Sequence, residues 1–555
     1  SNTDFAKDDR SNVTIDLNHN KLNLKLNYDM GAGIAAVGHG AQIDRGGTVE
    51  INNAGAINVD LKTKGLSAAL FANLGGKITI HNGGENAENT VLKARAMSTA
   101  KNNAAVIKTM NGNRSALTQD GKQSEITIDG LVDVLADGKA DENGYAANEA
   151  VSAVASTINI GGGSIQAVNG AWAAIRAYGE FVSPNYGIVN INVENKVMGP
   201  DKDGSKAYNV KSFDIGNYKT QIVGDIVTNG GMGTKGQINV GLNGKDSYWE
   251  GNYADTRGYG VTQGVLGAVN LKMKDGAHWK GFGNGSMNVQ MTGNDTYWLG
   301  FNIDKDSMQL SLNDGATWHN AITKDQVDQK NKAATAKVGH LSGTGGIIDM
   351  TGANVFVAMS SSLSGSPTSD ASSAITESKN GVTGDVEIGS YSGSQTVIYK
   401  HEIVDNTARE NAGFYGNKAA SIIGGDFRIA NAADGSAITL RTDRDGLNLD
   451  STLYTDKNLV NDTLDKLANK LYYTANDGKL SGKVEIAEGL TASSVSKRLE
   501  DITFSTESTG TKTAGQGYYR YDLSYPDSQI TNPMDKTIDG TQESEDAYRN
   551  AGIYK

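Results

Sequence analysis

Cysteine is absent from this chain of 555 residues, and its absence excludes several kinds of chemistry. Disulfides, thiol catalysis and zinc clusters built on thiolates all need a residue that the sequence does not contain. Proline is also rare, at 5 residues, whereas glycine reaches 69. The lack of a Gly-X-Y period excludes collagen. Many glycines with few prolines indicate many tight turns between strands, some of which need a positive φ.

Long apolar runs and basic clusters are missing as well. No run of about 18 apolar residues occurs, so we predict no membrane-spanning helix. The net charge is −12, and the 51 Lys and Arg residues are scattered along the chain. Because nucleic-acid binding needs a basic stripe, we predict no nucleic-acid partner. The charge also weakens the case for binding sulfated polysaccharide, without excluding it.

The most regular part of the sequence lies between Ile238 and Trp318. Apolar and polar residues alternate there, a turn with Gly and Asp follows, and an aromatic residue closes the unit. Strict alternation is the period of a strand with one buried face. The last three Trp are 19 and 20 residues apart, a spacing typical of a stacked β repeat. One such unit cannot bury its own apolar face, so we expect it to lie on a copy of itself. The four copies are 238–249, 271–279, 287–298 and 310–318.

Short alternating strands with Ala-rich pieces between them recur from Val13 to Val193, at longer intervals. Small residues suit a narrow interior where successive layers lie close together. The longer intervals predict projecting loops, and two further polar stretches interrupt the later strands, the first of them with a possible short helix. The predicted loops are 83–89, 137–148, 199–207, 323–337 and 360–380.

The carboxy-terminal part has a different pattern. Leu464, Leu467 and Leu471 recur at helical spacing within Asn461–Leu471, and Ser493–Glu500 is a second candidate helix. A solenoid needs its last coil covered, because an open end exposes core and strand edges. We therefore predict a β-solenoid over 1–455, a capping and folding segment over 456–526, and a polar tail over 527–555.

The sequence resembles the passenger domain of a monomeric (type V) autotransporter adhesin of the AIDA-like and pertactin-like group from Gram-negative bacteria. Two features carry the resemblance: the DGAxW repeats at Asp275–Trp279 and Asp314–Trp318, and the stretch 464–494. The resemblance implies an all-β fold, a right-handed parallel β-helix with three sides and a carboxy-terminal cap. It further implies a signal peptide and an outer-membrane barrel beyond the two ends, and hence a cell-surface location anchored by that barrel.

Catalytic motifs known from related passengers are missing. The sequence has no Gly-Asp-Ser-Gly tetrapeptide, and its seven His stand in strand and turn contexts without a motif around them. We therefore predict no catalytic residues, no cofactor and no enzymatic activity. The alternative is a β-helix polysaccharide lyase or hydrolase, which needs carboxylates aligned on one face. The acidic residues considered for it include Asp60, Asp129, Asp133, Glu194 and Asp349.

Metal binding has little support in the sequence. The loops that begin at Asp201 and Asp443 resemble the start of a calcium loop, but their twelfth positions are Ser212 and Tyr454 instead of Glu. Both are better explained as Asp-Gly turns, so we predict no metal site.

Aromatic and amide residues in the repeats supply the candidate binding surface. The repeat Trp residues either stack inside the solenoid or form an exposed carbohydrate-stacking surface, and core stacking is the favoured interpretation. Repeated Asn residues either form ladders or lie on a flat polar face. The candidate ligand-binding residues are Tyr248, Tyr297, Asn239, Asn288, Asp246 and Asp295.

The favoured function is that of a surface adhesin that binds through the long side of the solenoid. Weak contacts repeated along such a side add up. The expected partner is the same protein on a neighbouring cell, causing aggregation and biofilm, or a host matrix protein or glycan.

Overall fold

The structure is a computed structural model, and its described residues are almost entirely β-strand. The chain forms two compact units, unit 1 with residues 1–290 and 358–376, and unit 2 with residues 291–357 and 377–555. Long parallel pairings dominate both units, which is consistent with the all-β solenoid that the alternation predicts. The described residues are 11–38, 46–84, 89–111, 123–179, 187–199, 209–228, 236–254, 268–302, 308–322, 335–359, 375–378, 381–405, 418–433, 435–442, 466–467, 469–473, 481–485 and 519–520.

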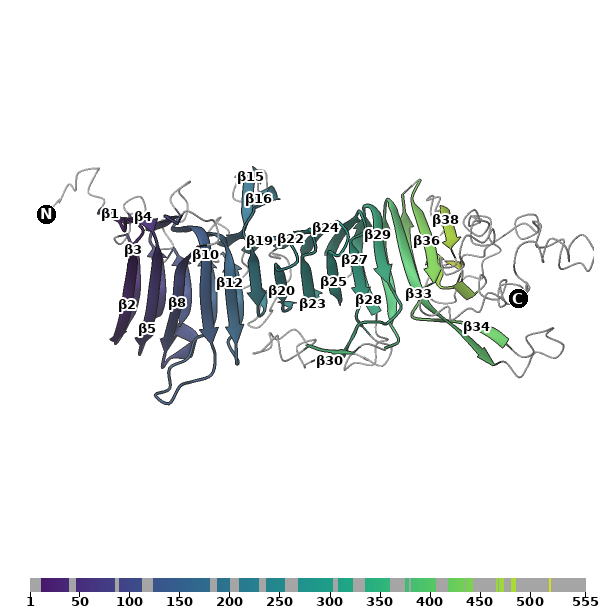
Figure 1. Cartoon of the computed structure of the whole chain (residues 1–555), viewed down its shortest axis with the longest axis horizontal. Coiled ribbons are helices and arrows are strands. Elements are labelled where there is room, and N and C mark those ends of the chain that lie inside the picture. Colours follow the sequence, from purple (N-terminus) through teal and green to yellow (C-terminus); the bar gives the residue numbers. More distant parts are fainter. Residues whose placement is uncertain are drawn as a thin grey trace, which may run out of the picture. The chain divides into compact units, whose positions relative to one another are not determined.

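Unit 1 contains three ladders of parallel strands, named ladders A, B and C. Figure 1 shows the ladder B strands side by side, with β10 and β12 each long enough to serve ladder A and then ladder B. Ladder A contains β1 (Asn12–Asp16), β4 (Thr48–Ala54), β7 (Lys77–Asn82), the starts of β10 (Glu125–Asp137) and β12 (Thr157–Val168), β14 (Gly187–Ile191), β19 (Gly236–Asn243) and β22 (Ala268–Lys274). Ladder B contains β2 (Lys21–Tyr28), β5 (Ala56–Thr63), β8 (Thr90–Ser98), the ends of β10 and β12, β17 (Thr220–Val223), β20 (Tyr248–Glu250) and β23 (His278–Asn284). Ladder C contains β3 (Gly31–Val37), β6 (Ser67–Asn73), β9 (Ala105–Met110), β11 (Glu149–Val154), β13 (Ala173–Tyr178), β18 (Ile226–Val227) and β21 (Tyr253–Ala254).

The core of unit 1 is built from rows of apolar side chains at equal positions of successive strands. In ladder B, Ile222 pairs in register with Trp249, which pairs with Trp279. The two indole rings are stacked, with centroids 4.7 Å apart and planes 3° from parallel. Both Trp side chains are fully buried, and each indole N–H donates to a backbone carbonyl. The prediction that the repeat Trp residues stack in the interior is therefore confirmed.

Ladder C explains the Ala-rich pieces of the sequence. The first six residues of β6 and all six of β11 are buried, so side chains on both faces of these strands are covered. Alanine fits where two covered faces leave little room. An inward apolar row still runs along the ladder, from Ile34 through Leu70, Ile107 and Val151 to Ile175.

A hairpin of β15 (Val193–Gly199) and β16 (Asn209–Ile215) interrupts unit 1 after β14. The sequence predicts one strand that continues to Val193, but β14 ends at Ile191. Asn192 has a φ of 54°, a left-handed conformation that breaks the strand and starts the hairpin. The hairpin packs on β19, where the side-chain amide of Gln237 accepts from the backbone N–H of Val210 and donates to its carbonyl.

Unit 2 continues the same pattern with two ladders. Trp298 stacks on Trp318, and the row goes on through Ile348, Val397 and Leu440. The first ladder contains β26 (Met308–Asn313), β28 (Thr335–Ser342), β32 (Asp385–Tyr391), β35 (Phe427–Ala432) and β37 (Leu471–Tyr473). The second contains β25 (Tyr297–Asn302), β27 (Thr317–Asn320), β29 (Thr344–Asp349), β33 (Ser394–Asp405), β36 (Ala437–Thr442) and β38 (Ser481–Glu485). The remaining strands are β24 (Met287–Thr292), β30 (Val355–Met359), β31 (Ile375–Ser378), β34 (Lys418–Ile423) and β39 (Tyr519–Arg520).

Several boundaries predicted from the sequence differ from those in the structure, and other predicted segments lie outside the described residues. The loop predicted over 323–337 ends before Thr335, where β28 already begins. Leu471 belongs to β37 and not to a helix, because it pairs in register with Phe427. Residues 466 and 467 are helical. Most of the predicted cap over 456–526, all of the tail over 527–555, the helix at 493–500 and the loop at 360–380 except 375–378 lie outside the described residues.

We predict that Trp279→Ala lowers the free energy of unfolding by about 3–5 kcal/mol, because it leaves a cavity in a fully buried stack. Tyr248→Ala on the neighbouring strand is the matched control, since that side chain points outward and is only half-buried. Urea unfolding followed by fluorescence and circular dichroism measures both. Equal effects of the two substitutions would contradict the assigned faces.

Candidate functional site

The outward face of ladder B carries a continuous row of polar residues. Equal positions of eight successive strands hold side chains that are all half-buried or exposed. Because parallel strands in one ladder lie about 4.8 Å apart, the row presents a polar group at regular short intervals. Its members are Asn23, Asn58, Lys93, Asp133, Ser164, Gln221, Tyr248 and His278.

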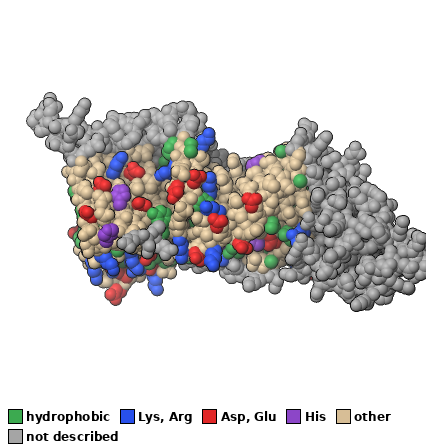
Figure 2. Space-filling model, turned by 45° about the horizontal axis from the view of Figure 1, so that its top comes forward, with side chains coloured by type: hydrophobic (Ala, Val, Ile, Leu, Met, Phe, Trp, Pro, Cys, Tyr) green, Lys and Arg blue, Asp and Glu red, His purple; other side chains and the backbone are tan. Residues whose placement is uncertain are grey.

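Charges of opposite sign alternate on this face. Lys25, Asp60 and Arg95 occupy equal positions of three successive strands, two residues along from the polar row. In the polar row itself, Lys93 forms an ion pair with Asp133, with an N–O distance of 3.2 Å. Such exposed pairs contribute little to folding stability. On the side of the molecule drawn in Figure 2, described residues of both signs are likewise interspersed.

Tyr248 and His278 end the row as a stacked pair. Their ring centroids lie 5.4 Å apart with an interplanar angle of 21°. Because one face of the Tyr248 ring lies against His278, that face cannot stack on a sugar. Partial burial, and then the charge of Glu250, raise the pKa of the Tyr248 hydroxyl. The hydroxyl therefore remains a hydrogen-bond donor at neutral pH.

Asn239 lies in a different environment from Tyr248. It is fully buried on ladder A, at the strand on which the β15–β16 hairpin packs. Its side-chain amide donates to Asn190 at 2.7 Å and accepts from Asn270 at 2.7 Å, and Asn190 donates in turn to Asn159 at 2.8 Å. The repeated Asn residues thus form a hydrogen-bonded ladder, one of the two arrangements left open by the sequence. Asn239 is not accessible to a ligand in this arrangement.

Of the three other candidates, Asn288 belongs to unit 1, and Asp295 and Tyr297 belong to unit 2. Asn288 is half-buried on β24, and Asp295 is exposed in a turn with a φ of 65°. The Tyr297 ring makes an edge contact with His319 at 5.6 Å, and His319 is hydrogen-bonded to Asp349 at 2.6 Å. Burial is the largest influence on the Asp349 carboxyl and would raise its pKa, but hydrogen bonds from His319 and Thr351 together hold that pKa below its usual range.

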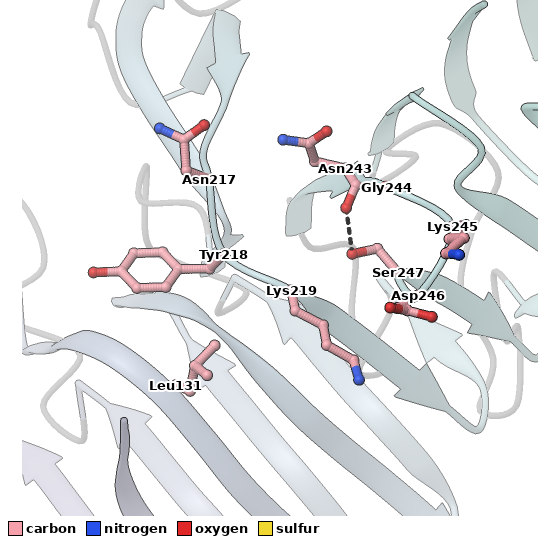
Figure 3. A pocket seen from close by; sticks show the side chains of 9 residues that line it. All are labelled: Leu131, Asn217, Tyr218, Lys219, Asn243, Gly244, Lys245, Asp246 and Ser247. Carbon is pink, nitrogen blue, oxygen red and sulfur yellow. Dashed lines mark hydrogen bonds between the residues drawn. The ribbon is translucent and has the colours of Figure 1, made fainter. Parts of the chain in front are cut away.

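A cavity of about 610 Å³ lies in unit 1, beside the polar row. Two connections form it: residues 217–219, which lead from the hairpin into β17, and residues 243–247, which turn from β19 into β20. Leu131 completes the lining. Figure 3 shows Asn217 and Asn243 on one side, with Lys219, Lys245 and Asp246 on the other. Of the predicted site residues, this cavity contains Asp246 alone, and Tyr248 lies two residues further along the chain.

Internal hydrogen bonds fix the walls of this cavity. The Ser247 hydroxyl donates to the carbonyl of Asn243 at 2.7 Å, drawn as the dashed line in Figure 3, and accepts from the N–H of Thr220 at 3.1 Å. The buried Asn192 side chain binds both the N–H and the carbonyl of Tyr218, at 3.0 and 2.9 Å. The carbonyl of Lys219 accepts from the N–H of Gly163 at 2.7 Å. Both connections are therefore rigid before any ligand arrives.

Tyr218 forms one edge of the cavity and points away from the lysines (Figure 3). Tyr218 lies against Gly161 and Gly162. A Cβ added at Gly161 would come within 2.9 Å of the Tyr218 ring, and one added at Gly162 within 2.5 Å of the Tyr218 Cβ. Its hydroxyl donates to Asp129 at 3.0 Å. Burial, followed by the hydrogen bond and charge of Asp129, raises the pKa of Tyr218 to about 12.

A second charged cluster lies on ladder C and pairs its own charges, although the buried Arg176 Nε has no hydrogen-bond partner among the described residues. Arg176 donates to Glu149 at 2.6 Å, and its guanidinium lies over the rings of Trp172 and Tyr178 at 4.1 and 4.2 Å. Burial lowers the pKa of the neighbouring Lys108. Because Arg176 and Glu149 pair with each other, this cluster stabilises ladder C.

Comparison with known proteins identifies no relative. No family model, no curated protein and no solved structure matches the chain. Among the residues that the structure describes, no group of three or more His, Asp or Glu is placed to hold a metal ion. Within the same residues, no helix has the length and apolar character needed to cross a membrane.

Lys219, Lys245, Asn217 and Tyr218 were not predicted as site residues. Lys245 lies in the turn of the first repeat, the other three lie in the connection before β17, and the cavity arises only where these two turns meet. Lys245 beside Asp246 was the one signal in the repeat, and no pattern in the sequence marked Lys219.

We expect Asp129→Asn to lower the pKa of Tyr218 from about 12, while burial keeps it above the ordinary value of 10.0. The difference in ultraviolet titration between the parent chain and Tyr218→Phe isolates this group. Because the folded pKa is raised, the stability that Tyr218 contributes is present below pH 10 and is lost as the pH rises towards 12. An unchanged titration in Asp129→Asn would contradict the hydrogen bond.

We expect His319→Gln to destabilise unit 2 by roughly 1–3 kcal/mol above the usual carboxyl pKa, because a largely buried carboxylate loses its partner. The Asp349 pKa is depressed in the fold, so its contribution is present above the usual carboxyl pKa and is lost as the pH falls through the folded value. Acid unfolding of the variant should therefore begin at a higher pH. His340→Gln is the control, because His340 is half-buried on the other ladder of unit 2.

Proposed function

We propose that this chain is a cell-surface adhesin that associates with copies of itself on neighbouring cells through the outward face of ladder B. The observation that supports the proposal is the alternation of charge along in-register rows of this face. A second copy that approaches in the opposite direction, displaced by one strand, opposes Asp60 of each copy to Arg95 of the other. Such a self-complementary contact is characteristic of twofold-symmetric association.

The proposal includes an architecture and a location. We propose that unit 1 is part of a right-handed, three-sided β-helix, and its three ladders of parallel strands support this architecture. The chain is the secreted passenger of a monomeric autotransporter, anchored at the cell surface by its own outer-membrane barrel. The DGAxW repeats support this assignment: Asp275–Gly276 and Asp314–Gly315 take up the same left-handed conformation in both turns.

A polar face of this kind suits reversible contact between cells. Each exposed pair contributes at most about 1 kcal/mol, so a single pair does not hold two copies together. Contacts along the face act together once the first has formed, since the later contacts occur at high effective concentration. A host matrix protein or glycan is the other partner expected for an adhesin of this class. Polysaccharide cleavage is a separate hypothesis, tested by the release of reducing ends.

Charge-swapped cells test self-association directly. Cells displaying Asp60→Lys, and cells displaying Arg95→Glu, should each stop clumping, because like charges then face each other at the Asp60–Arg95 contact. Mixing the two kinds of cells should restore clumping. In sedimentation velocity, each purified variant should associate at least tenfold more weakly than the parent chain.

Glu50→Lys with Lys77→Glu, on ladder A, is the control and should leave clumping unchanged. Both swapped variants should keep the circular dichroism of the parent, since exposed pairs add little to stability. Clumping that persists in each variant alone, or that fails to return on mixing, would sink the proposal for ladder B.

A further inference from the structure

We propose that the cavity between residues 217–219 and 243–247 is a binding site for a saccharide unit that carries a carboxylate. This site is separate from the self-association of ladder B. Its volume of about 610 Å³ lies within the range of roughly 300–1,000 Å³ that is usual for small-molecule sites.

The cationic groups of the site are available to a ligand. Lys219 and Lys245 are exposed lining residues, and neither forms an ion pair within the described part of the chain. Together with Asp246 they give the lining a charge of two minus one, or +1, in a chain whose net charge is −12. An acidic ligand would gain favourable charge-assisted hydrogen bonds from two ammonium groups.

The other lining groups favour a saccharide over a small inorganic anion. Asp246 repels a compact, highly charged anion, but its carboxylate accepts hydrogen bonds from hydroxyl groups. Asn217 and Asn243 each offer both a donor and an acceptor in their side-chain amides, and Figure 3 shows them extending in a similar direction. In a saccharide that carries a carboxylate, the carboxylate would pair with the two lysines. Its hydroxyl groups would bond to Asp246 and to the two asparagine amides.

The rigidity of the walls reduces the cost of binding. The hydrogen bonds of Ser247 and Asn192 hold both connections in place. Gly244 has a φ of 85°, and its backbone N–H donates to the carbonyl of Lys274 at 3.1 Å. Little backbone freedom remains to be lost when a ligand enters. Ligand recognition then depends on the exposed ends of the two lysines and the two asparagines.

Titration calorimetry on the intact chain tests the site with three hexasaccharides. The first alternates glucuronate and N-acetylglucosamine, the second is the same compound with its carboxyl groups reduced to alcohols, and the third is sulfated. We expect the carboxylated compound to bind and the reduced compound to bind at least tenfold more weakly. Rising salt should weaken the binding of the carboxylated compound, because the attraction is partly electrostatic.

Three variants place the binding in the cavity. Lys219→Gln with Lys245→Gln should lower affinity for the carboxylated hexasaccharide about tenfold or more. Asn217→Trp, which fills the opening without changing the charge, should have a similar effect. Lys139→Gln, an exposed lysine outside the cavity, is the matched control and should bind as the parent does. The ladder B variant Asp60→Lys should also keep its affinity, which separates this test from that of self-association.

Three results would overturn the proposal. Equal binding of the carboxylated and reduced compounds would show that the carboxylate is not recognised. Unchanged affinity in the double lysine variant or in Asn217→Trp would place binding elsewhere. Tighter binding of the sulfated compound, weakened equally by Lys139→Gln, would show a general charge attraction and no defined site.

Discussion

In-register hydrogen bonding between parallel strands is the constraint on which the rest of the structure depends. Once one strand of ladder B is in place, each strand added to the ladder repeats the same positions about 4.8 Å further on. An apolar residue must then lie on an apolar residue, as Ile222, Trp249 and Trp279 do. The stacked indoles are the strictest case, because flat rings pack efficiently only when their planes are nearly parallel, here within 3°.

The same register arranges the surface. Outward positions repeat as faithfully as inward ones, so polar residues form rows whether or not they contact each other. On ladder A the row becomes a chain of side-chain amides through Asn190, Asn239 and Asn270, which satisfies groups that the hairpin buries. On ladder B the corresponding row stays open to solvent, and Lys25, Asp60 and Arg95 beside it alternate in charge. A regular core thus produces a regular surface, and the proposed self-association uses that regularity.

A cavity arises where the regularity fails. Asn192 leaves the β-region, the hairpin β15–β16 leaves the ladder, and the chain returns through residues 217–219. The returning connection does not follow the turn of the next coil at 243–247, and a cavity remains between them. The glycines at 161 and 162 allow Tyr218 to lie across the corner, since a Cβ at either position would collide with it. Local departure from the repeat therefore supplies the enclosed site that a flat ladder cannot.

The sequence by itself determined the strand period, the buried Trp positions and the Asp-Gly turns, because these depend on alternation and on local backbone preference. Tertiary structure decided what alternation cannot encode. Asn239 and Tyr248 both occupy outward positions of the repeat, yet the hairpin covers the first and leaves the second open. Leu471 has helical spacing but pairs with Phe427, because a strand edge offers hydrogen bonds that local propensity does not outweigh. Likewise, Lys219 and Lys245 come together only through the coiling of the chain, since 25 intervening residues must first complete a turn around the core.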